Sequence, residues 1–143
     1  MERRVQAHTT SLREMDDPRA VVARDLTDAA LPALSADRRF ATAYNAALQL
    51  SKMVIACAGY RVTGTGHHRT TFEAMELVLG PSESGLSAYF DACRRKRNVV
   101  DYDLANVASD TEAEQLLREV ERFRGIVEAW IASSHPGLAG SGP

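Results

Sequence analysis

The stretch SADRRFATAYNAALQLSKMVIACAG, residues 35–59, has the most regular apolar spacing in the first half of the chain. From Phe40 to Ala58 its apolar residues recur at intervals of three and four, which is typical of one face of an α-helix. Ser35 is suited to cap the start of this helix and Gly59 its end. Many of its residues are alanines, whose small side chains let a neighbouring helix approach closely. We therefore expect this helix at the centre of a bundle.

Four further helices are predicted from the same spacing and from helix start and stop signals. Asp17-Pro18 is typical of a helix N-terminus, because the first turn does not use the donor that Pro lacks, and this helix should end before Pro32. The other three are expected to begin at a capping box at residues 70–73, at Ser82 or Ser84, and at a capping box at residues 109–112. No alternation of period two is long enough to predict a sheet. The sequence therefore predicts an all-α fold, an antiparallel bundle of about five helices.

The length and composition indicate one domain. A chain of 143 residues that is 45% hydrophobic can bury one core and is too short to expect two. We expect the helical bundle domain to cover residues 18–132. Residues 1–17 are polar and of mixed charge, which predicts a flexible N-terminal segment. Residues 133–143 are rich in Gly, Ser and Pro, which predicts a disordered C-terminal tail.

Charge and cysteine content restrict the class of function. The 17 Lys and Arg against 19 Asp and Glu give a net charge of −2, so any contact with nucleic acid must be local. Cys57 and Cys93 fall on apolar helical stripes and are interpreted as core residues in a reducing compartment. No apolar run is long enough for a membrane span, and the start of the chain lacks the apolar stretch of a signal peptide. The protein is expected to be cytoplasmic and to have no contact with a membrane.

The stretch RRKRNVVDYD, residues 94–103, places four cations ahead of an acid, an aromatic residue and a second acid. Counting back from Arg97 at helical spacing gives Cys93, Phe90 and Leu86, so Arg97 lies on the apolar stripe of its own helix. Burying a guanidinium without a partner is costly. Arg97 is therefore expected to meet an acid, a carbonyl, a phosphate or the mouth of a groove, and the rest of the chain to present it.

The stretch YRVTGTGHHR, residues 60–69, is the main connection in the chain. Its Gly64-Thr65-Gly66 lacks the Lys of a P-loop, and no strand precedes it as in a dinucleotide fold. His67 and His68 have no Cys or acidic cluster at ligand spacing, so no metal site and no cofactor are expected. The favoured interpretation is a loop followed by a helix N-terminus. The alternative is that the two histidines, which titrate near neutral pH, line the same groove as Arg97.

Three blocks of the chain resemble the HEPN (higher eukaryotes and prokaryotes nucleotide-binding) family of bacterial type. The blocks are RFATAYNAA at residues 39–47, Gly59-Tyr60-Arg61 together with HHRTTFE at residues 67–73, and Arg95 to Asn98 with the segment through Tyr102. With the closing helix, the resemblance covers about residues 18–132. It implies a four- or five-helix bundle that forms a homodimer. It also implies either a metal-independent ribonuclease of toxin–antitoxin or defence systems or a partner of a small nucleotidyltransferase.

The catalytic pattern of the family is an Arg, usually followed by a polar residue, and then a His after four to six residues. Arg97 and Asn98 match its first half, but Tyr102, Asp103 and Leu104 stand where the His is expected. A neutral His can take a proton near neutral pH, whereas a Tyr with a pKa near 10 is almost fully protonated there. The resemblance therefore implies Arg97, Asn98 and Tyr102 as the catalytic set. Ligand binding is assigned to a groove with five side chains: Arg94, Arg97, His67, His68 and Asp101.

Three functions remain open at this stage. The favoured one is a dimeric, non-hydrolytic HEPN-like protein that binds a nucleotide, RNA or a nucleotidyltransferase-type partner at Arg97. The second is an atypical endoribonuclease in which Tyr102, helped by His67 or His68, replaces the missing His. The third is an assembly module in which Arg97 pairs with Asp101, Asp103 or a carboxylate of a second chain.

Overall fold

The computed structural model describes residues 5–63, 67–100 and 105–140. Over these residues the chain forms two short strands, five α-helices and two turns of 3-10 helix: β1 (Val5–Ala7), α1 (Leu12–Ala29), α2 (Ala36–Cys57), β2 (Tyr60–Val62), α3 (His68–Leu79), η1 (Pro81–Glu83), α4 (Leu86–Val100), α5 (Asp110–Ser134) and η2 (Pro136–Leu138). The prediction of an all-α bundle of about five helices is confirmed. The expectation of no strands is wrong, because β1 and β2 pair antiparallel, although three residues are too few to give a visible alternation.

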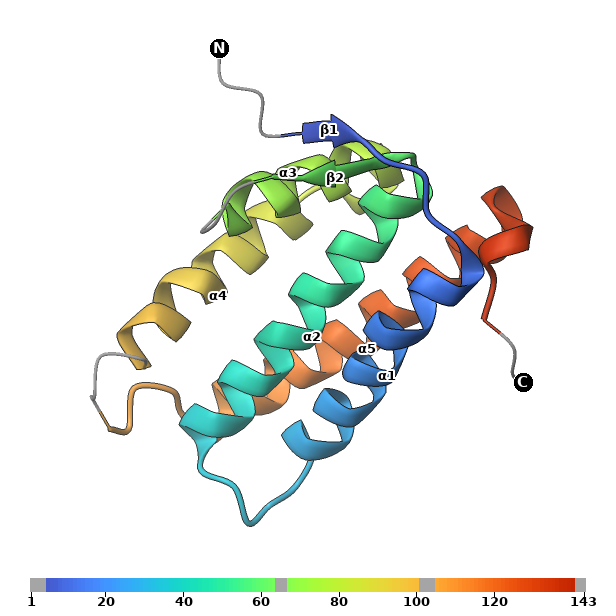
Figure 1. Ribbon diagram of the computed structural model, residues 1–143. Helices are drawn as coiled ribbons and strands as arrows, with labels where there is room; N and C mark the ends of the chain where they lie inside the picture. Colours follow the sequence, from blue (N-terminus) through green and yellow to red (C-terminus); the bar gives the residue numbers. More distant parts are fainter. Residues whose placement is uncertain (1–4, 64–66, 101–104, 141–143) are drawn as a thin grey trace.

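The helix α2 lies at the centre of the bundle and packs against α1, α3, α4 and α5 (Figure 1). Ser35 caps it as expected, because the Ser35 side chain accepts a hydrogen bond from the backbone N–H of Arg38. Ala43, Ala46 and Ala47 have no exposed surface, so their small side chains lie at close helix contacts as predicted. The rest of the bundle is therefore arranged around this one helix.

Three polar residues of the RFATAYNAA block join α2 to three different helices. Arg39 forms an ion pair with α5, and Tyr44 makes a hydrogen bond to α3. Asn45 donates through Nδ2 to Asp25 of α1 over 2.7 Å, and Asp25 is only 4% exposed. The polar residues in this block thus fix how the neighbouring helices are placed around α2.

The first helix begins earlier than its sequence signals indicate. Ser11, not Asp17, is the N-cap of α1, and its side chain accepts from the backbone N–H of Glu14. Pro18 lies inside the helix. The expected boundary at Asp17 is wrong because the added turn buries Met15, which is 1% exposed. This stabilisation favours the longer helix despite the donor that Pro18 lacks.

The start of α3 also differs from the prediction. The helix begins at His68, its N-cap is His67, and no side chain caps it. The Thr71 hydroxyl donates to the His67 carbonyl over 2.9 Å, so the capping box expected at residues 70–73 does not form. The fourth helix begins at Leu86, later than the expected Ser82 or Ser84, because η1 occupies residues 81–83. A helix N-terminus does follow this connection, but it lies at His68, two residues before the expected start, and residues 60–62 form β2 where a loop was expected.

The C-terminal residues pack onto the bundle further than expected. The helix α5 continues to Ser134, and η2 follows it. The Arg19 guanidinium makes two 2.9 Å bonds to Glu128 and one 2.7 Å bond to the carbonyl of Leu138. The expectation that the chain does not fold from Ser133 is wrong for these residues, since this arginine holds the turn in place. Flexibility of residues 1–17 and 133–143 stays a prediction.

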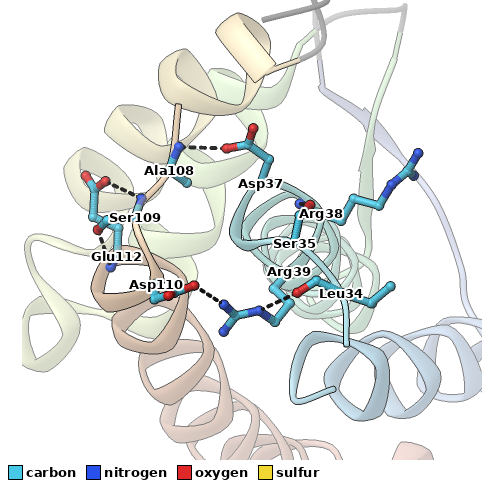
Figure 2. A network of polar contacts seen from close by, with 9 residues as sticks. All are labelled: Leu34, Ser35, Asp37, Arg38, Arg39, Ala108, Ser109, Asp110 and Glu112. Carbon is cyan, nitrogen blue, oxygen red and sulfur yellow. Dashed lines mark hydrogen bonds and ion pairs between the residues drawn. The ribbon is translucent and has the colours of Figure 1, made fainter. Parts of the chain in front are cut away.

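A network of hydrogen bonds joins the start of α2 to the start of α5 (Figure 2). Asp37 accepts from the backbone N–H of the buried Ala108 over 2.7 Å. Ser109 and Glu112 form the predicted capping box, with both of its hydrogen bonds at 3.0 Å. We call this region the α2–α5 corner and define it by six residues: Asp37, Arg39, Ala108, Ser109, Asp110 and Glu112. The corner fixes where the chain enters α5.

Two further observations concern the core and the helices. Cys57 and Cys93 are buried free thiols, and burial raises the pKa of each thiol to about 11, so both stay protonated as expected of core residues. Among the residues that the structure describes, no helix is sufficiently long and apolar to cross a membrane.

Candidate functional site

Arg97 lies near the end of α4, on the same stripe as three buried residues. Leu86, Phe90 and Cys93 are each 6% exposed or less, so the predicted position of Arg97 on the apolar stripe is confirmed. Arg97 is half-buried as a whole residue, and the central carbon of its guanidinium lies 5.6 Å from the centroid of the Tyr44 ring. This distance allows a cation–π contact, which holds the guanidinium against the face of the ring.

The Tyr44 ring connects Arg97 to His68. Tyr44 is 1% exposed, and its hydroxyl oxygen lies 2.8 Å from Nδ1 of His68 in hydrogen-bonding geometry. Phe72 meets the Tyr44 ring edge-on, and Phe90 packs against Phe72. We call Tyr44, His68 and Arg97 the Tyr44 cluster. Its members come from α2, α3 and α4, so the site exists only when these helices pack together.

His68 is held in its neutral form. Burial lowers the pKa of its imidazole below the ordinary value, and the positive charges of Arg97, Lys52 and Arg94 lower it further. Burial also raises the pKa of Tyr44, against the opposing effect of Arg97, so its hydroxyl keeps its proton. If the ring donates through Nδ1–H to the phenol oxygen, Nε2 is basic. If the phenol donates to Nδ1, Nε2 carries the proton. The contact therefore sets which nitrogen can exchange a proton with a ligand.

A buried carboxylate organises the arginines that precede Arg97. Asp91 is 9% exposed and accepts from Arg94 and Arg95, each over 2.7 Å. The hydrogen bond from Arg94 is the main cause of the lowered pKa of Asp91, and the charges of Arg95 and Arg69 add to it. The side chain of Arg95 is 64% exposed. Asp91 thus pairs with two arginines, and Arg69 has its own ion pair with Glu73 at 3.7 Å. Two carboxylates against these three arginines leave the surface with excess positive charge.

The structure brings together some of the predicted site residues. Arg97 and His68 belong to the same cluster, and Arg94 is close enough to lower the pKa of His68. Asn98 is half-buried at the next position of α4. His67 occupies the N-cap position of α3 and lines a pocket together with His68. Tyr102 and Asp101 lie outside the residues that the structure describes.

Sequence reasoning missed Tyr44, Lys52 and Asp91 as site residues. Tyr44 belongs to a block that carried the family resemblance. Its contact with Arg97 depends on how α2 packs on α4, which no local pattern in the sequence shows. Asp91 stands three and four residues before Arg94 and Arg95, which is the spacing of side-chain pairs on one helix face. That spacing could have identified Asp91 from the sequence as the partner of the two arginines.

In the described part of the chain, no three His, Cys, Asp or Glu side chains gather as metal ligands would. The expected absence of a metal and of a cofactor stays a prediction. The chemistry that these residues offer is a guanidinium with its neighbouring cations, which suits a phosphate, and a neutral imidazole, which can take or give a proton near neutral pH.

The fold and the site define a helical-bundle protein in which a tyrosine of the central helix joins an arginine of α4 to a histidine of α3. The sequence matches the SAV_6107-like HEPN family over residues 30–128, and the chain belongs to this family. Neither a comparison with curated proteins nor one with solved structures gives a match. The resemblance to HEPN proteins is therefore confirmed at the level of the family.

Proposed function

We propose that the protein binds RNA, with a phosphate of the strand held by Arg97 at the Tyr44 cluster. The observation that carries this proposal is the position of the half-buried Arg97, whose guanidinium lies 5.6 Å from the centre of the Tyr44 ring. A guanidinium held by a ring loses little freedom when it binds a phosphate, and it offers two parallel donors.

The surrounding charge supports the same proposal. Arg69 and Arg95 have side chains that are 70% and 64% exposed, and Lys52 is also exposed. A strand that crosses this surface would meet several cations in succession, although the whole chain carries a net charge of −2. Local positive charge is the feature that single-stranded nucleic acid requires of a binding surface.

Fluorescence anisotropy with a labelled single-stranded RNA tests the proposal. Arg97→Ala should weaken binding about tenfold, which corresponds to about 1.4 kcal/mol. It should also lower the slope of log K against log salt by about 0.7, the share of one phosphate contact. Arg97→Lys keeps the positive charge but lacks the two parallel donors of the guanidinium, so its RNA affinity should be intermediate. Arg118→Ala is the matched control, because the Arg118 side chain is 79% exposed on α5.

A loss of binding counts only if the variant is folded. The helical circular dichroism signal and the melting temperature of Arg97→Ala are therefore measured alongside. Arg95→Gln gives an independent reading, since Arg95 is exposed and its replacement leaves the Tyr44 contact intact. Equal RNA affinity in wild type, Arg97→Ala and Arg95→Gln would overturn the proposal and favour the assembly module.

His68 favours a second function, cleavage of the bound RNA through its own 2′-hydroxyl. The lowered pKa keeps the imidazole neutral at neutral pH, which is the form needed for a general base. In that reaction His68 takes the proton of the 2′-hydroxyl, the 2′-oxygen bonds to phosphorus, and the bond from phosphorus to the 5′-oxygen breaks. The 5′-oxygen takes a proton from water, and a 2′,3′-cyclic phosphate forms. His68 takes the role that the resemblance gave to Tyr102, and Arg97 stabilises the charge on the phosphate.

Incubation with labelled RNA in EDTA tests cleavage. His68→Gln should reduce the rate by about 100-fold or more, the usual contribution of a general base, while RNA affinity changes less than about threefold. His67→Gln is the matched control, because His67 neighbours His68 in the chain and does not contact Tyr44. Wild-type protein that binds RNA and leaves it uncleaved would overturn the second function and leave the first in place.

The assembly of the protein is a separate proposal. We propose that the protein forms a homodimer, because members of the family that the chain resembles usually do. Light scattering on a sizing column measures the molar mass in solution. A nucleotidyltransferase-type partner, a role in toxin–antitoxin or defence systems and the cytoplasmic location stay predictions.

A further inference from the structure

A pocket of about 500 Å³ lies between β2, the segment before α1, the first turns of α1, the end of α2 and the start of α3. In Figure 1 the paired strands β1 and β2 cross the end of α2 beside α3, and the chain descends from β1 into α1. The backbone N–H of His8 donates to the carbonyl of Gly59 over 2.8 Å, which holds the segment before α1 against the end of α2. The size is within the usual range for a small-molecule site.

The lining of this pocket combines an apolar floor with a cationic rim. The floor includes Met15, Pro18, Ile55 and Val62. Lys52 and Arg61 are exposed cations on the rim. These features suit a ligand with a flat, weakly polar ring and an attached anion.

Glu14 is the only acid among the described residues that line the pocket. Its carboxylate already accepts from the His8 ring over 3.2 Å and from the Thr10 hydroxyl over 3.1 Å. Lys52 and Arg61 supply two positive charges against this single negative charge, so the net charge that these three side chains give the lining is positive. The pocket therefore favours an anion over a cation.

His68 belongs to this pocket and to the Tyr44 cluster at the same time. Its Nδ1 meets Tyr44, while the residue also lines the pocket. Lys52 and Arg97 both lower the pKa of its imidazole, although Lys52 lines the pocket and Arg97 lies over the Tyr44 ring. His68 thus connects the pocket, through Tyr44, to the guanidinium of Arg97.

We propose that this pocket binds one nucleotide of the RNA strand, with the base on the apolar floor and its phosphate at Lys52. This inference rests on the proposed function, since it names where the nucleotide next to the phosphate at Arg97 lies. Stacking and apolar contact with the base make the site tolerant of sequence, because every base has an apolar face. The contact between the phosphate and Lys52 makes the affinity for the nucleotide fall as the salt concentration rises.

Titration with AMP, GMP, CMP and UMP, followed by calorimetry and by amide chemical shifts, tests the pocket without the strand. We expect at least one mononucleotide to bind and to shift the amides of Ala56, Val62 and Thr71, whereas inorganic phosphate alone should bind at least tenfold more weakly. Ala56→Leu, which extends a partly exposed lining residue into the pocket, should weaken mononucleotide binding at least tenfold. Lys52→Gln should weaken it about fivefold, and as an exposed replacement it leaves the core intact.

Arg97→Ala separates the pocket from the proposed function. Mononucleotide binding should survive in this variant within about threefold, while RNA binding falls. RNA affinity should fall at least fivefold in Ala56→Leu, with Arg118→Ala as the control. RNA binding that depends on Arg97 but is the same in Ala56→Leu and wild type would overturn the pocket and leave the proposed function in place. Mononucleotide binding without any RNA binding would overturn the proposed function, and with it the assignment of the pocket to an RNA strand.

Discussion

The α2–α5 corner and the Tyr44 cluster both depend on polar residues of the same helix, and they use them in different ways. In the corner, Asp37 bonds a buried backbone N–H, and Arg39 pairs with Asp110, whose side chain is 80% exposed. In the cluster, a tyrosine orients a cation and a neutral histidine. The corner supplies hydrogen-bond partners to backbone groups that would otherwise be buried without one, so its role is structural. The cluster instead places groups that suit a ligand.

The two regions also differ in their balance of positive and negative charge. Glu112 in the corner accepts from Lys96 over 2.7 Å, and this bond is the main cause of its lowered pKa. In the cluster, the three charges that act on His68 are all positive, from Arg97, Lys52 and Arg94. Acids and bases balance where α5 begins, while positive charge dominates where α3 and α4 meet α2. A region with unbalanced charge is the better candidate for binding an anion.

The largest expected effect comes from removing the ring that both the core and the cluster use. Tyr44→Ala should lower the free energy of unfolding by about 3–5 kcal/mol, the usual range for deletion of a buried aromatic side chain. Urea denaturation followed by circular dichroism measures it. Tyr44→Phe is the control, because it loses only the hydroxyl and should cost about 1 kcal/mol. A cost for Tyr44→Ala as small as that for Tyr44→Phe would contradict the burial of this ring.

The corner should respond to mutation in stability and not in RNA binding. Asp37→Ala removes the acceptor of the Ala108 N–H, which then lies buried without a partner, and should cost about 1–3 kcal/mol. Asp37→Asn keeps an acceptor oxygen and should cost less. RNA affinity, measured by anisotropy at a temperature where both variants are folded, should match wild type. A tenfold loss of RNA affinity in Asp37→Ala would remove the distinction between the two regions.

Much of the fold is predictable from local patterns, whereas the site is not. Ser35, the alanines of α2 and the capping box at Ser109 each carry a signal within one helix, and each is placed as expected. Arg97 on an apolar stripe is also a local signal, and the structure places this residue over the Tyr44 ring, in the candidate site. Its contact with Tyr44 joins residues that are far apart in the sequence, so no spacing predicts it.

Two local predictions failed because tertiary contacts outweighed them. Asp17-Pro18 has the features of a helix start, yet burial of Met15 extends α1 beyond it. Residues 70–73 have the pattern of a capping box, yet the helix begins at His68, whose ring meets Tyr44. In both places a side chain packed against another helix decides the boundary.

The smallest expected effect is a change of stability with pH. His68 has a lowered pKa in the folded state, so between that value and the ordinary value near 6.5 the unfolded chain binds more protons. Stability should therefore fall as the pH drops through 6.5. The melting temperature of wild type should decline between pH 7.5 and 5.5 more steeply than that of His68→Gln, while His67→Gln should keep the wild-type slope. Identical slopes for His68→Gln and wild type would contradict the burial of this ring.

The most direct test of the site is the pKa of His68, measured by NMR of the labelled imidazole with and without saturating RNA. A phosphate held at Arg97 would offset the positive charges around the ring, so the pKa of His68 should rise when RNA binds. In RNA-free Arg97→Ala it should also rise, because one of those charges is gone. A pKa of His68 that is the same in RNA-bound and RNA-free wild-type protein would contradict the account, since it would place the RNA elsewhere on the molecule.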